Sequence, residues 1–370
     1  MAAGCARGRL ERVRAACAAE HLDAFFVRDL SSIRWLTAFD DVFDDEDAHA
    51  LLVDSRDVVL HTDSRYTEAA RQAAEGTSIA VDDKRQTHSA FAIRFLAEGR
   101  TVALGIEDTL MLGEYRALEA ARAQAASSLQ VRETSGFVRS LRAVKDPTEV
   151  ARLKAAQAIT DAAFAHLVGF MRAGMTERAV QIELEDFMRR HGADGLAFPS
   201  IVATGANGAS PHAIPGDTPL EAGQCVVLDF GARAQGYCSD MTRTVFLGAP
   251  DARMRAAYEA IRCANERVQA ALKPGVTGAA MHALAEQVLA EAGFGGKMGH
   301  SLGHGVGIDI HEEPNLSPRN PNPLVEGNVV TIEPGVYLPG EFGMRLEDFG
   351  VLTHEGFAVF TESGHDMMVI

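Results

Sequence analysis

The sequence predicts two domains, an α/β domain over residues 1–140 and an α+β domain with an internal duplication over residues 146–370. Three observations support this. At 370 residues the chain exceeds the length at which a single hydrophobic core usually stops growing. The first domain alternates short strand patterns with helix patterns. In the second domain, residues 172–192 and 273–293 align without a gap at an offset of 101 positions.

The strands of the first domain are short apolar runs bounded by turn residues. They cover residues 23–27, 50–62 (a hairpin that turns at Ser55 and Arg56) and 101–106. We expect a helix after Ser64, whose hydroxyl would cap it, and a second helix that begins near Leu112. The domain carries no Gly-rich phosphate-binding loop and no catalytic cluster, so the chemistry is expected in the second domain.

A helix start marks the domain boundary. Asp146 is expected as the N-cap, Pro147 as the first helical residue and Glu149 as the third, which together form a capping box. Apolar residues then recur at helical spacing, and this predicts a long amphipathic helix that ends at Gly174.

The duplication is visible in the helix signals that follow. In each copy a glycine ends one helix, a threonine caps the next and a second glycine closes it. The equivalent pairs are Gly174 and Gly275, Thr176 and Thr277, and Gly192 and Gly293. Either two helical hairpins merely share cap chemistry, or a duplicated domain presents its halves across a cleft.

Acidic residues occur in a β-hairpin after the first pair of helices. VVLDF and SDMTRTVFL predict two strands, and a turn centred between Ala234 and Gln235 would place Asp229 opposite Asp240. Like charges at paired positions destabilise a sheet, so the pair would need a cation. The alternative is that both carboxylates face solvent, but the apolar run 226–228 beside Asp229 disfavours it.

The same arrangement follows the second pair of helices. A connection centred on Gly340 would place Glu333 opposite Glu347. Arg345 lies two residues before Glu347, on the same face of the predicted strand, where its guanidinium could orient carboxylates. Each copy of the duplicated segment is therefore followed by a hairpin with two facing acids, so the candidate site follows the same duplication.

Three histidines, His300, His304 and His311, lie between the hairpins in the Gly-rich segment 299–314. A lone histidine is usually structural, but three near four candidate carboxylates favour a site. Strict strand alternation would send His304 and His311 to opposite faces, so a bulge or a bend is required.

Four acids and one histidine form an oxygen-rich set of ligands, more typical of Mn²⁺ or Co²⁺ than of a zinc thiolate site. Two divalent cations would balance four carboxylates. Such a pair lowers the pKa of a bridging water and directs it at a carbonyl or phosphoryl centre.

The overall composition excludes several classes of protein. The net charge is −16 and the pI is about 5.3, which disfavours nucleic acid and anionic membranes as partners. No apolar run approaches the length of a membrane span, and the N-terminus lacks the apolar core of a signal peptide. The five cysteines lack CxxC spacing, which predicts reduced thiols and a cytoplasmic location. Cys225 and Cys238, near the ligand strands, are expected as small buried residues.

The segment HSLGHGVGIDIHE (300–312) resembles the signature of aminopeptidase P and proline dipeptidase, in the creatinase-like "pita-bread" metallopeptidases. The resemblance extends through LDFGARAQGYCSDMTRT, TIEPGVY and MRLED. It reaches more weakly into SIRWLTAF (32–39) and TDSRYTEAA (62–70), which look like the creatinase-type N-terminal domain. It implies an α/β creatinase-type domain followed by an α+β pita-bread domain with a pseudo-two-fold duplication.

The resemblance also implies roles for single residues. The metal ligands would be Asp229, Asp240, His304, Glu333 and Glu347. Asp240 and Glu347 would bridge the two ions, and Glu333 would also carry a proton from the bridging water to the leaving amine. His212 would bind substrate, together with His300. His311 would bind substrate and stabilise the tetrahedral intermediate, and Arg345 would support the carboxylates.

The function implied is hydrolysis of Xaa-Pro bonds in proline-containing peptides, by a homodimer. The compact catalytic domain favours an Xaa-Pro dipeptidase, and aminopeptidase P acting on longer peptides is the alternative. No ligand is missing, so creatinases and relatives without metal, including a binding scaffold on this fold, are disfavoured.

Two further features have alternative interpretations. Residues 299–303 also match G-x-S-x-G, the nucleophile elbow of serine hydrolases, but lack the strand before it and the helix after it. The acidic run 40–47 is expected to be a solvated loop. The resemblance implies an alternative, in which these acids meet the amino terminus of a substrate in the partner subunit's cleft.

Overall fold

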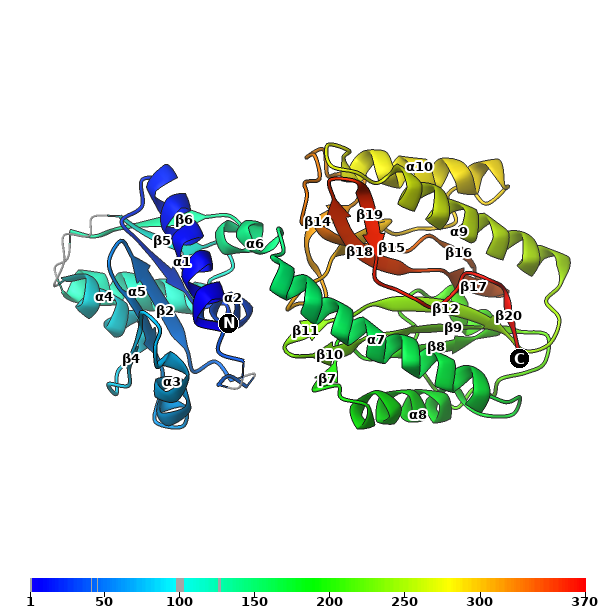
Figure 1. Cartoon of the computed structure of the whole chain (residues 1–370), viewed down its shortest axis with the longest axis horizontal. Coiled ribbons are helices and arrows are strands. Elements are labelled where there is room, and N and C mark those ends of the chain that lie inside the picture. The colour runs from blue at the N-terminus through cyan, green and yellow to red at the C-terminus, as the bar shows by residue number, and fades with distance from the viewer. Residues whose placement is uncertain (1, 41, 45, 98–102, 126–127) are drawn as a thin grey trace. The chain divides into compact units, whose positions relative to one another are not determined.

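The computed structural model describes residues 2–40, 42–44, 46–97, 103–125 and 128–370. Its internal contacts divide the chain into two compact units, Met1–Arg142 and Ala143–Ile370 (Figure 1).

The first unit is an α/β domain built on one six-stranded sheet with the order β4-β3-β2-β1-β5-β6. β2 is antiparallel to both of its neighbours, whereas β1 and β5, β5 and β6, and β3 and β4 pair in parallel. The strands are β1 Ala24–Val27, β2 Ala50–Asp54, β3 Val58–His61, β4 Ile79–Asp82, β5 Ala103–Glu107 and β6 Gln130–Thr134. The helices are α1 Ala2–Ala19, α2 Leu30–Thr37, α3 Thr67–Ala74, α4 His88–Ala97, α5 Leu112–Gln124 and α6 Phe137–Arg142.

The predicted elements of this unit are present, with one correction. The hairpin turns after Asp54 as expected, and α5 begins at Leu112. Residues 101 and 102 of the predicted third strand lie outside the described residues. Ser64 does not cap α3, because the helix begins only at Thr67, and its N-cap Tyr66 makes no side-chain capping bond.

The acidic segment 40–47 exposes its described carboxylates to solvent, as expected. Positions 41 and 45 lie outside the described residues. The segment is nevertheless anchored, since the hydroxyl of Tyr66 donates to both carboxylate oxygens of Asp44 at 2.8 Å.

The second unit consists of two halves of similar construction. The first half contains α7 Pro147–Phe170, α8 Glu177–Arg190, β7 Gly195–Leu196, β8 Ile201–Thr204, the 3₁₀ helix η1 Gly205–Ala209, β9 Cys225–Phe230, β10 Ala232–Ala234, β11 Tyr237–Cys238 and β12 Met241–Phe246. The second half contains α9 Ala252–Ala271, α10 Gly278–Glu291, β13 Gly303–Gly305, β14 Glu312–Leu316, β15 Val329–Ile332, β16 Gly335–Leu338, β17 Phe342–Arg345, β18 Asp348–Thr353, β19 Gly356–Val359 and β20 Met368–Val369. Within this unit, α7 and α8 run along one side of the strands and α9 and α10 along the other (Figure 1).

The structure confirms the duplication. Thr176 and Thr277 each cap a helix by accepting a hydrogen bond at 3.1 Å from the amide three residues on. Ahead of these caps, Gly174 and Gly275 have φ values of +89° and +96°, in the left-handed region that favours glycine. Each half has an apolar core under its helices, and the core of the second half also includes Cys225 and Phe246 from the strands of the first. Shared cap chemistry alone does not account for this correspondence.

The long helix α7 begins as predicted and ends earlier than predicted. Asp146 accepts from the amides of Thr148 and Glu149, and the Glu149 side chain accepts from the amide of Asp146, which completes the capping box. The helix ends at Phe170 rather than at Gly174, because Met171 already adopts an extended backbone.

None of the helices in the described part of the chain combines the length and the hydropathy of a membrane-spanning segment.

Candidate functional site

The first pair of acids lies in and next to the ladder between β9 and β12, in a register that differs from the prediction. Asp229 pairs with Thr242 and not with Asp240. The turn lies one residue later than expected, at Gln235 and Gly236, which have φ values of +51° and +78°. Positive φ at both central residues is typical of a type I′ turn, whose twist matches that of the strands. Asp240 therefore directly precedes β12, two positions before the partner of Asp229.

The second pair of acids lies in the predicted register. Ile332 pairs with Asp348 on one side, and Gly335 pairs with Arg345 on the other. Glu333 and Glu347 occupy the gap between these two ladders and so lie opposite each other. Gly340, at the centre of the connection, has a φ value of +80°.

His304, on β13, completes the cluster. Its Nε2 lies 3.5 Å from Oδ2 of Asp240 and 3.4 Å from Oε1 of Glu333. Nδ1 donates to the carbonyl oxygen of Gly305 at 3.0 Å, so Nε2 of the neutral ring keeps its lone pair toward the acids. Ligand atoms of Asp240, His304 and Glu347 all lie within 4.8 Å of one another.

An irregularity in the ladder between β13 and β14 accompanies the approach of His304 to His311. The register between β13 and β14 shifts between Gly303 and Gly305. The rings of His304 and His311 then meet edge to face, with centroids 4.4 Å apart. This shift of register meets the requirement, stated from the sequence, for a bulge or a bend between the two histidines.

Arg345 connects the carboxylates of the two halves. Its guanidinium donates to Asp229 through Nη2, to the hydroxyl of Thr242 at 2.9 Å and to the hydroxyl of Tyr337 at 2.8 Å. Thr242 in turn donates to Oε2 of Glu347 at 2.6 Å. All five side chains are buried, so the network is shielded from solvent.

The carboxyl groups of Asp240, Glu333 and Glu347 are destabilised as anions at this site. Burial, followed by repulsion from Glu347, Asp229 and Glu333, raises the pKa of Asp240 well above its ordinary value. Burial and the neighbouring acids likewise raise the pKa of Glu347, and burial raises that of Glu333. The single positive charge of the Arg345 guanidinium does not balance four carboxylates. Divalent cations would supply the missing positive charge, so the donor set fits a metal centre.

The three remaining histidines border this cluster. Nδ1 of His300 donates to the carbonyl of Ser301 at 2.7 Å, and its Nε2 accepts from the hydroxyl of Tyr337 at 3.0 Å. Burial lowers the pKa of His300 and of His311, which keeps both rings neutral. The exposed His212, in the turn after η1, lies close enough to lower both pKa values further.

Three polar residues at the site are absent from the prediction. Thr242 bonds Glu347, Tyr337 joins His300 to Arg345, and Thr331 donates to Oε1 of Glu333 at 3.1 Å. Residues two positions apart on a strand point to the same face. Thr242 lies two positions after Asp240, and Thr331 lies two before Glu333, so this spacing would have placed each threonine on the same face as its acid. Tyr337 has no comparable local signal.

Two predictions about nearby residues are confirmed. Cys225 and Cys238 are buried, and burial raises the pKa of each thiol to about 12. Such thiols are unreactive. Ser301 lies in an irregular segment that leads into β13 and not into a helix, so the geometry of a nucleophile elbow is absent.

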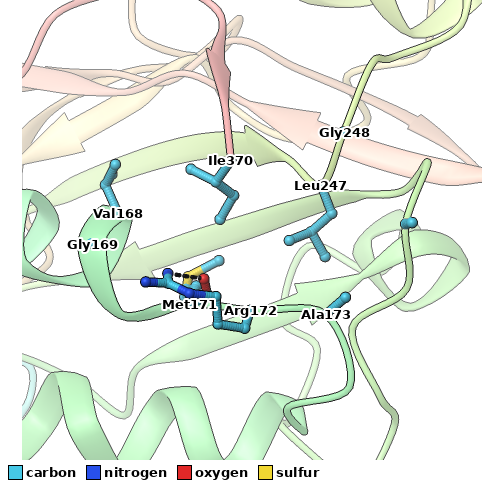
Figure 2. A pocket seen from close by; sticks show the side chains of 9 residues that line it. Val168, Gly169, Met171, Arg172, Ala173, Leu247, Gly248 and Ile370 are labelled. Carbon is cyan, nitrogen blue, oxygen red and sulfur yellow. Dashed lines mark hydrogen bonds between the residues drawn. The ribbon is translucent and has the colours of Figure 1, made fainter.

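A separate cavity of about 390 Å³ lies at the end of α7 (Figure 2). Its lining is Val168, Gly169, Met171, Arg172, Ala173, Ala222, Leu247, Gly248 and Ile370. It shares no residue with the carboxylate cluster. Its one charged side chain, Arg172, donates to the backbone of Met171 at 2.6 Å, so the cavity offers no catalytic constellation.

Comparison with known proteins agrees with this site. The sequence model of metallopeptidase family M24 matches residues 151–354, and that of the creatinase/prolidase N-terminal domain matches residues 9–144. The chain is 34% identical over 369 residues to the uncharacterised peptidase YqhT of Bacillus subtilis, covering 98% of this chain and 100% of that protein.

Solved structures show the same likeness. The Xaa-Pro dipeptidase from Bacillus anthracis has a TM-score of 0.91 at 36% identity, over 99% of this chain and 100% of that one. The X-Pro aminopeptidase from Thermotoga maritima has a TM-score of 0.86 at 33% identity, over 98% and 100%. The chain therefore belongs to metallopeptidase family M24, a family of metal-dependent hydrolases, and carries a creatinase/prolidase N-terminal domain ahead of its pita-bread catalytic domain.

Proposed function

We propose that this protein is an Xaa-Pro dipeptidase that uses two divalent cations, Mn²⁺ or Co²⁺. The cations would be held by Asp229, Asp240, His304, Glu333 and Glu347. The observation that carries this proposal is the buried cluster of four carboxylates, too poor in positive charge to be stable alone, with the lone pair of His304 directed into it. Its oxygen-rich donor set favours Mn²⁺ or Co²⁺ over a zinc thiolate site.

The cations would supply Lewis acidity and a water molecule of lowered pKa. Glu333 would take a proton from the attacking water and deliver it to the proline nitrogen as the peptide bond breaks. The hydroxyl of Thr331 fixes one oxygen of Glu333 at 3.1 Å, which orients the carboxylate for this transfer.

Three histidines would contact the substrate. His311, whose ring meets that of His304 edge to face, would donate a hydrogen bond to the carbonyl oxygen as negative charge develops there. His212 and His300 would hold the peptide beside it. Arg345 would remain with Asp229, Thr242 and Tyr337, where it keeps the carboxylates in place.

Substrate length separates the dipeptidase from the second candidate, an Xaa-Pro aminopeptidase. The likeness to the Thermotoga aminopeptidase favours this second candidate. The test compares kcat/KM for an Xaa-Pro dipeptide with kcat/KM for the same peptide extended by several residues. A preference of about tenfold or more for the longer peptide, ~1.4 kcal/mol in the transition state, would replace the first candidate by the second.

Metal analysis tests the centre itself. We expect about two divalent cations per chain after reconstitution with Mn²⁺ or Co²⁺. Purified protein that binds no cation and cleaves no Xaa-Pro peptide would instead favour a binding scaffold.

We also propose that the protein is a homodimer located in the cytoplasm. The five cysteines lack CxxC spacing, a pattern typical of reduced thiols in a reducing compartment. Light scattering coupled to size exclusion would give the number of subunits.

A further inference from the structure

A buried ion pair lies behind the segment that carries His311. Nζ of Lys145 lies 2.9 Å from Oε2 of Glu312, and the two side chains are only 1% and 7% exposed. The residues are 167 positions apart in the sequence. Removing two charges from water is costly, and an apolar pair of similar volume often stabilises a fold as well or better. The pair therefore needs a reason other than stability.

Glu312 directly follows His311, and its side chain contacts the turn that precedes His311. Its other oxygen, Oε1, accepts from the amide of Asp309 at 3.1 Å. The carboxyl group also packs flat on Gly307, where an added Cβ would lie 2.5 Å from its carbon and both its oxygens. One carboxylate thus joins Lys145 to the turn 307–311.

Lys145 is a rigid point of attachment. Its amide donates to the carbonyl of Gly327 at 2.9 Å, and the preceding residue, Val144, forms a β-bridge with Asn328. The next residue, Asp146, is the N-cap of α7. With its backbone held on both sides, Lys145 has little freedom to follow a moving carboxylate.

The opposite side of the turn is held by the first half of the duplicated domain. The amide of Cys238 donates to the carbonyl of Gly307 at 2.8 Å, and Nη1 of Arg233 donates to the carbonyl of Ile308 at 3.0 Å. The turn is thus clamped between β10 and β11 on one side and the ion pair on the other. A shift of the turn would move the ring of His311 away from His304.

We propose that Lys145 is a positioning residue, which acts through its ion pair with Glu312 to hold the His311 imidazole in place. It would act through Glu312 and not through contact with substrate or metal. This inference rests on the proposed function, because it assigns to His311 a part in the reaction. It predicts that the effect of Lys145 on catalysis disappears when His311 is absent.

The test is a double-mutant cycle between Lys145→Met and His311→Ala, with an Xaa-Pro dipeptide as substrate. We expect Lys145→Met to lower kcat by about tenfold in the parent protein, with unchanged metal content, and by less than about twofold in the His311→Ala background. Equal losses in both backgrounds would overturn the proposal, since Lys145 would then act on overall structure. The matched control is Lys273→Met, the same change at an exposed lysine after α9.

A second measurement does not depend on activity or on metal. In metal-free protein, hydrogen exchange of the amides in residues 303–313 should be about tenfold faster in Lys145→Met than in Lys273→Met. Unchanged exchange would contradict the clamp. If Lys145→Met does not fold, Glu312→Gln tests the same pair, because it keeps the volume and removes the charge. Failure of the proposed function looks different, since the parent protein itself would then cleave no Xaa-Pro peptide.

Discussion

Thr242 and Glu347 are joined twice across the two halves of the catalytic unit. The hydroxyl of Thr242 donates to Oε2 of Glu347 at 2.6 Å, and the amide of Glu347 donates to the carbonyl of Thr242 at 3.1 Å. Thr242 also pairs with Asp229 in the ladder and accepts from Arg345. One threonine therefore orients a proposed ligand from each half.

Thr242→Val keeps the shape of the side chain and removes the hydroxyl. We expect the affinity for Mn²⁺ to fall by about 10- to 100-fold, because Glu347 loses the bond that orients it and Arg345 loses an acceptor. Isothermal titration of metal-free protein measures this. Thr353→Val is the control, at a threonine whose hydroxyl bonds the nearby hairpin residues Glu355 and Gly356. Equal affinity in both variants would show that Thr242 does not orient the ligand.

Removal of metal should lower stability as well as activity. Without cations the buried carboxylates repel one another and are destabilised as anions, as the raised pKa values of Asp240 and Glu347 indicate. After chelation, Mn²⁺ or Co²⁺ at about 100 times its Kd should add roughly 2.7 kcal/mol to the free energy of unfolding. Thermal melts across a metal titration measure the gain. Full turnover by metal-free protein is the result that would rule out the mechanism.

Substitutions should distinguish the proposed metal ligands from residues that act on the substrate alone. Asp240→Asn and Glu347→Gln remove a charge from the centre of the cluster, so we expect both to lose the pair of cations. His311→Ala should retain the metal and lower kcat and kcat/KM together, as for a group that acts mainly in the transition state. Elemental analysis of each variant decides the matter. Loss of both ions from His311→Ala would contradict its role.

The first unit should be sensitive to acid. Burial lowers the pKa of His49 to about 4 and that of His88 to about 3, against an ordinary value of 6.5. The unfolded chain then binds more protons than the folded one, so stability falls as the pH drops from 6.5 toward the folded values. Each such histidine contributes up to about 1.4 kcal/mol per pH unit in this window.

His88→Asn tests this prediction. Nδ1 of His88 lies 2.7 Å from Nδ1 of His61, and an asparagine amide can still donate there without titrating. The loss of stability between pH 6.5 and 4 should shrink accordingly. Urea unfolding followed by fluorescence of Trp35, the single tryptophan, buried in the first unit, measures it. His354→Asn, on the exposed surface of the second unit, controls for the substitution, and equal pH profiles for the two variants would refute the prediction.

Local signals in the sequence predicted much of the fold. The capping box at Asp146 and the caps at Thr176 and Thr277 need only a few neighbouring residues, and all three form. The Glu333–Glu347 register followed from Gly340, where a positive φ marks the centre of the turn. The predicted register of Asp229 was wrong because Gln235 is also a central residue of the turn, with a positive φ. Glutamine rarely adopts a positive φ, so the sequence did not mark this position as part of the turn.

Long-range contacts of the site could not be predicted in the same way. The ion pairs Arg345–Asp229 and Lys145–Glu312 join residues 116 and 167 positions apart. The expectation that Arg345 orients carboxylates came from its position on the strand, whereas nothing local identifies Asp229 as its partner. The partner of Lys145 likewise depends on how the Gly-rich segment folds back on itself, which periodicity does not encode.

The two hairpin registers also determine where the chain tolerates insertions. One extra residue at Gln235–Gly236 would slide β12 along β9 and, unless a bulge absorbed it, turn Thr242 to the other face of the sheet. The connection at Gly340 is under the same restriction. The exposed turn at residues 354–355, between β18 and β19, carries no such constraint, and an epitope or fluorophore tag inserted there would leave the spacing of the proposed ligands intact.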